Sequence, residues 1–108
     1  MAIAAAEDRL TLIDELRARI DQLDRDARLL SIGELCRRVD AVRNIAGAAR
    51  LLPLARLAGG LRDALAREGR GASVRTWTDV MREAIGHDAQ DEATATAFLT
   101  AVAARLAG

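Results

Sequence analysis

The chain has 108 residues, a length that suits one domain with a single modest core. Its 16 basic residues balance 16 acidic ones, and the formal net charge of zero gives no long-range attraction to nucleic acid or to an anionic membrane. Aromatic residues are limited to Trp77 and Phe98, and few segments are rich in β-branched residues. This composition argues against a sheet and predicts an all-α protein.

The number of cysteines and the first residues of the sequence indicate the cellular location. Cys36 is the only cysteine, so an internal disulfide is excluded and a reducing cytoplasm is expected. The first residues show neither a basic leader nor an apolar run of signal-peptide length, and no stretch approaches transmembrane length. We therefore expect a cytoplasmic protein.

Two long helices are predicted in the first half of the chain. Apolar residues at spacings of three and four predict the first over residues 7–30, with residues 1–6 as a flexible tail. Its stripe consists of Leu10, Ile13, Leu16, Ile20, Leu23, Ala27 and Leu30. Ser31 and Glu34 have the spacing of a capping box, which predicts a second helix from Ile32 to about Leu51.

Three shorter helices are predicted to follow. Pro53 suits the first turn of the third helix, which ends near the glycines at residues 69–71. A capping-box pattern at residues 76–79 predicts the start of the fourth helix, which stops at Gly86. Acidic residues from Asp88 to Asp91 predict the start of the last one. Short connections predict that successive helices pack as antiparallel neighbours in one domain spanning residues 1–108.

The segment from Arg43 to Ala49 resembles the phosphoacceptor helix of histidine phosphotransfer (HPt) domains, whose pattern is approximately H-x-L-K-G-A-A followed by spaced leucines. The matching residues are Ile45, Gly47, Ala48, Ala49, Leu54 and Leu57. Arg43 stands in the place of the histidine and Ala46 in the place of the lysine. The resemblance implies an antiparallel four-helix bundle of HPt type with an additional short helix, and a role in bacterial two-component or phosphorelay signalling.

The resemblance also implies a partner, since HPt domains dock receiver domains of response regulators or histidine kinases at this helix. Arginine cannot carry phosphate as histidine does, because guanidinium stays protonated and has no free lone pair. The hypothesis is therefore a pseudo-phosphotransfer protein that acts by binding and is not an enzyme. Its contact residues would be Asp40, Arg43, Asn44, Gly47 and Arg50.

Helical geometry supports this patch but leaves alternatives open. At about 100° per residue, Arg43 lies roughly 80° from the middle of the core stripe, on a flank shared with Cys36, Asp40, Gly47 and Arg50. Gly47 either leaves room for a partner or lets a neighbouring helix pack close. Arg43 either reaches for the acidic pocket of a receiver domain or is an ordinary solvated arginine.

The remaining candidates offer less chemistry. His87, the only histidine, is a displaced phosphoacceptor or, by the more economical reading, a residue of a loop or helix cap. One histidine and one cysteine on different helices are too few for a metal site, and the sequence predicts no cofactor. Two further functions stay open: active phosphotransfer through His87, and a structural bundle that forms a homodimer.

Overall fold

The computed structural model describes residues 2–108, with side chains from residue 6 onward, and it is helical throughout. The helices are α1 (Ala2–Asp26), α2 (Ile32–Ala48), α3 (Leu52–Glu68), α4 (Val74–Ile85) and α5 (Glu92–Ala107), with a 3-10 turn η1 (Gly69–Gly71) after α3. No strand occurs within these residues, which confirms the all-α prediction. In the described part of the chain, no helix combines the length and the apolar character that crossing a membrane requires.

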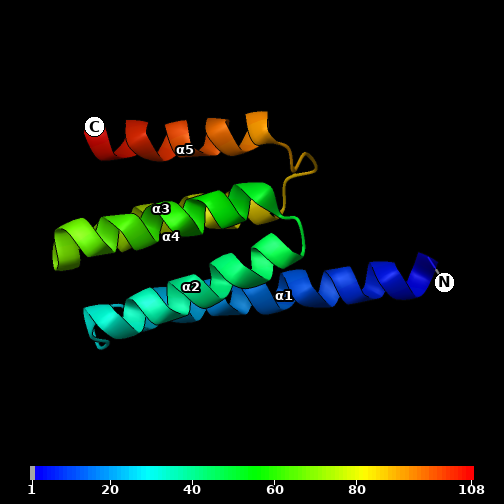
Figure 1. Cartoon of the computed structure of the whole chain (residues 1–108), viewed down its shortest axis with the longest axis horizontal. Coiled ribbons are helices and arrows are strands. Elements are labelled where there is room, and N and C mark those ends of the chain that lie inside the picture. Colours follow the sequence, from blue (N-terminus) through cyan, green and yellow to red (C-terminus); the bar gives the residue numbers. More distant parts are fainter. Residues whose placement is uncertain (1) are drawn as a thin grey trace.

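The first four helices contact one another in a closed cycle. Helix α1 packs against α2 and α4, while α3 packs against α2 and α4. Helix α5 lies against α3 and α4, on the side opposite α1 and α2 (Figure 1). Helix α4, with 12 residues, is the shortest of the five helices, and α5 has 16.

The core lies between these helices and is almost entirely aliphatic. Leu16, Ile20 and Leu23 of α1 are buried as predicted. Leu10, which the periodicity placed on the same stripe, is 62% exposed. The N-terminal part of α1 extends past the ends of the other helices, so the stripe there has nothing to pack against (Figure 1).

The predicted starts of α2, α3 and α5 are confirmed, and that of α4 is wrong. The Ser31 hydroxyl accepts a hydrogen bond from the Glu34 amide at 3.1 Å, Pro53 lies in the first turn of α3, and the Asp91 carboxylate caps α5. Helix α4, however, begins at Val74 and not at the capping-box pattern of residues 76–79. Trp77 within that pattern is buried, so this turn belongs to the core-facing part of the helix.

The other differences concern helix ends. Helix α1 begins at Ala2, so residues 2–6 continue the helix and only residue 1 of the expected tail lies outside the described residues. It ends at Asp26 instead of Leu30, and the guanidinium of Arg70 donates to the carbonyls of Ala27 and Leu30 in the turn that follows. Helix α2 ends at Ala48, three residues before the expected Leu51.

Candidate functional site

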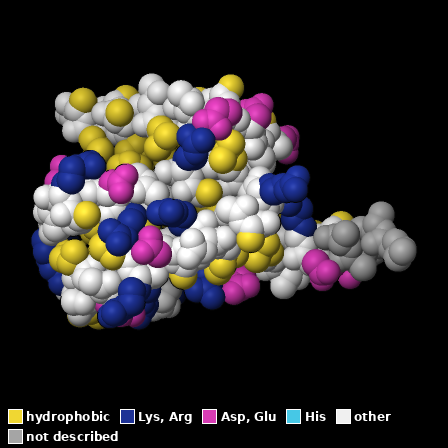
Figure 2. Space-filling view, in the orientation of Figure 1, with side chains coloured by type: hydrophobic (Ala, Val, Ile, Leu, Met, Phe, Trp, Pro, Cys, Tyr) yellow, Lys and Arg dark blue, Asp and Glu magenta, His cyan; other side chains and the backbone are white. Residues whose placement is uncertain are grey.

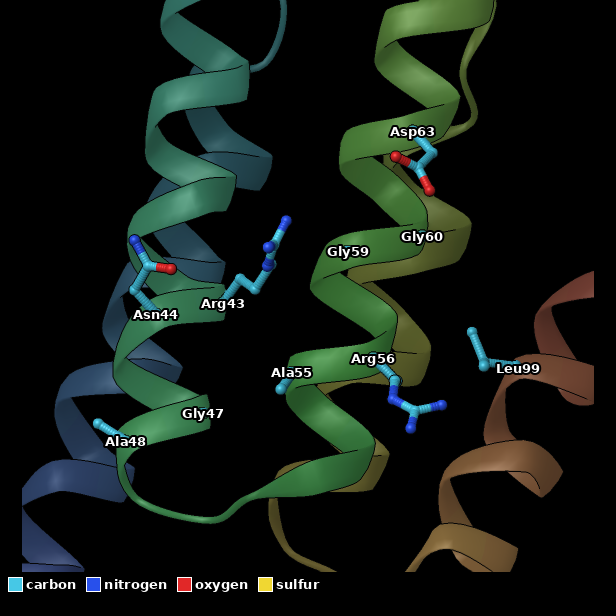
Figure 3. A pocket seen from close by; sticks show the side chains of 10 residues that line it. All are labelled: Arg43, Asn44, Gly47, Ala48, Ala55, Arg56, Gly59, Gly60, Asp63 and Leu99. Carbon is cyan, nitrogen blue, oxygen red and sulfur yellow. The ribbon is translucent and has the colours of Figure 1, made fainter.

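The C-terminal half of α2 borders an open groove that runs over α3 toward α5 (Figure 3). Its volume is about 710 Å³. The lining residues are Arg43, Asn44, Gly47 and Ala48 of α2, Ala55, Arg56, Gly59, Gly60 and Asp63 of α3, and Leu99 of α5. Three of the five contact residues proposed from the sequence therefore line one groove, and two, Asp40 and Arg50, lie outside the lining set.

The floor of the groove is formed by small residues of α3. A Cβ on Gly59 would meet only the Cδ of Arg43, at 3.8 Å, which is ordinary contact. A Cβ on Gly60 would lie 2.6 Å from two ring atoms of Trp77, so this residue must be glycine for the indole to fit. The two neighbouring glycines thus have different effects. Gly60 leaves room for the Trp77 side chain in the core, whereas Gly59 adds no side chain to the floor of the groove.

Arg43 projects from α2 across this floor toward α3 (Figure 3). The side chain is exposed, and no carboxylate of the described residues lies within 4.0 Å of its guanidinium. Asp63 also lines the groove, farther along α3, without an ion pair to Arg43. A guanidinium held in this way keeps its five donors available for a carboxylate or phosphate, which it can bind with two parallel hydrogen bonds.

Gly47 lies one turn after Arg43 and is open on its outer side. A Cβ at this position would meet no atom within 4 Å. The interpretation that Gly47 permits close packing of a neighbouring helix is therefore wrong. A glycine within a helix is less stable than alanine by about 1 kcal/mol, and no contact of the described residues accounts for that cost here.

Asp40 is already engaged within the fold. Its carboxylate accepts a hydrogen bond from Nε of Arg62 at 3.1 Å, which joins α2 to α3 one turn before Arg43. This bond and the charge of Asp40 raise the pKa of Arg62. Because the bridge holds the carboxylate at the edge of the groove, Asp40 positions the two helices more directly than it offers a contact.

Arg50 has an unusual backbone conformation. Its φ of 60° lies in the left-handed region, which glycine adopts easily and other residues adopt at a cost of roughly 1–2 kcal/mol. The amide of Arg50 donates to the carbonyl of Gly47, and the amide of Leu51 donates to that of Ala46. These two bonds form a Schellman motif that ends α2, with arginine at the position where glycine is favoured.

The position that corresponds to the family's lysine faces the interior. Ala46 has an exposed fraction of 0%, and a longer side chain there would enter the core between the helices. The groove therefore receives no positive charge from this position. The departure from the HPt pattern concerns geometry as well as residue identity.

The sequence did not identify the α3 and α5 sides of the groove. The guanidinium of Arg56 binds both oxygens of Glu92, at 2.7 and 2.9 Å, and so closes the side toward α5. Leu99 adds an apolar edge. Consecutive glycines in the third helix were a detectable signal, because each is unfavourable there, whereas the Arg56–Glu92 pair joins residues 36 positions apart and has no sequence signature.

Charges of both signs alternate over this face of the molecule. Figure 2 shows arginine and acidic side chains interspersed, without a continuous patch of either sign. Recognition here would therefore depend on the placement of individual charges and not on a large electrostatic field.

His87 lies away from the groove, in the turn between α4 and α5. Its Nδ1 accepts a hydrogen bond from the amide of Ala89 at 3.2 Å, and its ring meets Phe98 edge to face at 5.4 Å. The depression of about 410 Å³ that it lines shares no residue with the groove of Arg43. Among the described residues, no group of three His, Cys, Asp or Glu side chains is placed to hold a metal ion.

Comparison with known proteins does not assign a family: no family model, curated protein or solved structure matches this chain. The resemblance to HPt domains thus rests on the sequence motif in α2 alone.

Proposed function

We propose that this chain is an HPt-like signalling protein that binds a receiver domain or a histidine kinase without carrying phosphate on α2. The observation that supports the proposal is Arg43, an exposed guanidinium without an ion-pair partner among the described residues, at the position that resembles the phosphoacceptor site. It lies across an open groove beside Gly47, whose outer side is free.

The chemistry of arginine suits binding and excludes phosphoryl acceptance at residue 43. A phosphoacceptor must be a nucleophile near neutral pH, and a guanidinium is not one. The same group binds carboxylates with two parallel hydrogen bonds. The acidic pocket of a receiver domain offers such carboxylates, so Arg43 would occupy the place that the phosphoacceptor histidine takes in a functional complex.

The proposed effect is that this chain competes with a true phosphotransfer protein for a receiver domain, or holds the receiver in one state. A chain that docks on a receiver through Arg43 would exclude a true phosphotransfer protein from the same surface. It would also favour whichever receiver state presents the more accessible carboxylates, because a ligand shifts an equilibrium only through its differential affinity for the two states.

The test is a binding and labelling experiment with the receivers and kinases of the genome that encodes this chain. We expect complex formation in titration calorimetry and no acid-labile label on the chain. Charge reversal in Arg43→Glu should weaken binding on the order of tenfold or more. Arg28→Glu is the matched control, since Arg28 is exposed, has no ion pair among the described residues and lines a different depression.

Three results would redirect the proposal. Equal affinity of the Arg43→Glu and Arg28→Glu variants would remove Arg43 from the interface. Label that disappears in His87→Ala would establish active phosphotransfer through the α4–α5 turn. No binding, together with a molecular mass that rises with concentration in light scattering, would favour a structural homodimer.

A further inference from the structure

A second depression lies at the other end of α2, where the α1–α2 turn, η1 and the start of α4 come together (Figure 1). Its volume is about 690 Å³, and it shares no residue with the Arg43 groove. Asp24 is the one carboxylate of its lining. Four arginines contribute to the same lining, namely Arg25, Arg28, Arg70 and Arg75. The depression therefore collects positive charge in a chain whose formal net charge is zero.

Arg70 is fixed in place by the backbone of the α1–α2 turn. Its Nη1 donates to the carbonyl of Ala27 at 3.0 Å and its Nη2 donates to the carbonyl of Leu30, so η1 is tied to that turn. Both acceptors are neutral, and no carboxylate of the described residues lies within 4.0 Å of this guanidinium. The two bonds leave the positive charge uncompensated and further N–H groups free beside the depression.

Arg25 and Arg28 also have no acidic partner within 4.0 Å in the part of the chain that the structure describes. Both side chains are exposed. Arg25 donates to the neutral Oε1 of Gln22 at 2.7 Å, and Arg28 makes no side-chain hydrogen bond to the described residues. Like charges gathered in one place repel one another, so a bound anion would relieve this repulsion.

The carboxylate of the lining is already neutralised. Asp24 lies 2.6 Å from Nη2 of Arg82 and 3.6 Å from Nε of Arg75, and its side chain is only 13% exposed. Arg75 also pairs with Asp79 at 3.3 Å, but its side chain is 79% exposed and such pairs are weak. Asp24 thus has no charge to spare for the other three arginines.

Helix capping accounts for only part of this cluster. Cations near a helix C-terminus stabilise its free carbonyls and its dipole, which explains Arg70 and Arg25 at the end of α1. Arg28, however, donates to no carbonyl of the described residues. Arg75 lies in the first turn of α4, where the helix dipole disfavours a cation. These two positions are better explained by an anion from outside the chain.

The start of α4 adds neutral donors to the same depression, whose lining includes Ser73 and Thr76. The Ser73 hydroxyl makes no capping hydrogen bond, unlike that of Ser31 at the start of α2. The amides of Thr76 and Trp77 donate to the carbonyl of Ser73, while the amide of Arg75 has no acceptor among the described residues. A free amide in the first turn of a helix is a donor to anions and supplements the guanidinium groups.

The remainder of the lining is mostly apolar. Its apolar residues are Ala27, Ile32, Leu35, Leu65, Ala72 and Val74. The volume of about 690 Å³ far exceeds that of a single phosphate ion and falls within the range of roughly 300–1,000 Å³ that is typical of sites for small organic molecules. The depression thus combines donors for an anionic group with apolar surface for the body of a ligand.

We infer that this depression binds a small organic phosphate. Arg25, Arg28 and Arg70 hold the phosphate group together with the first turn of α4, and the apolar lining contacts the organic part. Guanidinium groups suit this role because they bind phosphate with paired hydrogen bonds. The site is independent of the proposed function, since it uses neither Arg43 nor any other residue of that groove.

The first experiment is an NMR titration of the full chain labelled with ¹⁵N. The probe is phenyl phosphate, with inorganic phosphate and phenol as its two parts and sodium chloride at matched ionic strength. We expect saturable shifts of the Arg75 amide and of the Nε–Hε signal of Arg28, with a dissociation constant on the order of 1 mM and about tenfold weaker binding of inorganic phosphate. Shifts that sodium chloride reproduces, or phenol or inorganic phosphate binding as tightly as phenyl phosphate, would overturn the inference.

The second experiment compares two charge-neutralising variants. Arg28→Gln removes a guanidinium that makes no contact within the described fold, so the affinity for phenyl phosphate should fall about fivefold without a lower thermal midpoint in phosphate-free buffer. Arg67→Gln is the matched control, because Arg67 in the last turn of α3 is exposed, has no ion pair among the described residues and lies outside the lining. Equal weakening in both variants would reduce the effect to general charge and refute the site.

A phosphoserine peptide distinguishes a small ligand from a phosphorylated protein. We expect it to bind no more tightly than phenyl phosphate, whereas an affinity about tenfold higher would make a phosphorylated protein the ligand and overturn the inference. Arg43→Glu should leave phenyl phosphate binding unchanged, and Arg28→Gln should leave receiver binding unchanged. Loss of one activity with retention of the other therefore shows which of the two proposals has failed.

Discussion

Three glycines on the α2–α3 face allow the packing to be tested residue by residue. Gly47→Ala introduces a methyl group into open space, since no atom lies within 4 Å of the new Cβ. Alanine is favoured over glycine within a helix by about 1 kcal/mol. For a domain of this size the entropy of unfolding is on the order of 0.2 kcal/mol/K, so the midpoint should rise by about 4 °C.

The neighbouring glycines of α3 provide the contrast. Gly59→Ala places a Cβ 3.8 Å from the Cδ of Arg43, an ordinary contact, and should stabilise the fold by a similar amount. Gly60→Ala places it 2.6 Å from the ring of Trp77, which is 8% exposed and cannot move aside freely. Overpacking of this kind costs about 1–3 kcal/mol, so the helix gain is cancelled and a net loss of about 1 kcal/mol is expected.

The assay is urea and thermal unfolding of the three variants, followed by circular dichroism. Trp77 is the only tryptophan, so its fluorescence reports directly on the packing at Gly60. A shifted emission maximum is expected in Gly60→Ala alone. Stabilisation by Gly60→Ala would refute the packing of α3 against Trp77, and destabilisation by Gly47→Ala would refute the open side of α2.

Two further predictions concern an ion-pair cluster between α1 and α4 and two carboxylates that accept side-chain hydrogen bonds. Arg82 of α4 joins Asp21 and Asp24 of α1, at 2.8 and 2.6 Å, so Arg82→Met leaves Asp21 unpaired and Asp24 with only the longer 3.6 Å pair to Arg75, and it should lower the free energy of unfolding by about 1–2 kcal/mol in urea titrations. Hydrogen bonds from Gln22 and Arg37 lower the pKa values of Asp26 and Glu34, respectively; folded pKa values below the unfolded ones stabilise the fold above about pH 4.5, and this contribution should disappear as the pH falls through the lowered values, as a pH series of thermal midpoints would show.

Much of the fold followed from local patterns. Spacings of three and four identified the first helix, and Ser31, Pro53 and Asp91 marked the starts of α2, α3 and α5, because these start signals act within one turn. The start of α4 was missed because threonine and aspartate at residues 76 and 79 imitate a capping box, whereas the burial of Trp77 requires that turn to be inside the helix. That burial depends on Gly60, a contact across two helices that periodicity does not contain.

The candidate site, too, was predicted from the sequence only in part. Arg43, Asn44 and Gly47 follow from the α2 motif and the geometry of one helix, and the structure places all three on one groove. The left-handed conformation of Arg50 was not expected, because the sequence predicted that α2 continues to Leu51. Such a residue is recognised only when the end of the helix and its hydrogen bonds are known.

Exposure alone does not make the α2 face functional, since most arginines of this chain are exposed. The stronger argument comes from positions where a residue destabilises its helix and no contact inside the protein compensates for that cost. Gly60 is unfavourable in a helix, but Trp77 explains it. Gly47 is unfavourable as well, and no contact of the described residues explains it. It lies one helical turn after Arg43, and both residues line the same groove. If the open side of Gly47 serves a partner, Gly47→Ala should raise the thermal midpoint and weaken binding at the same time, so this substitution is the most informative one.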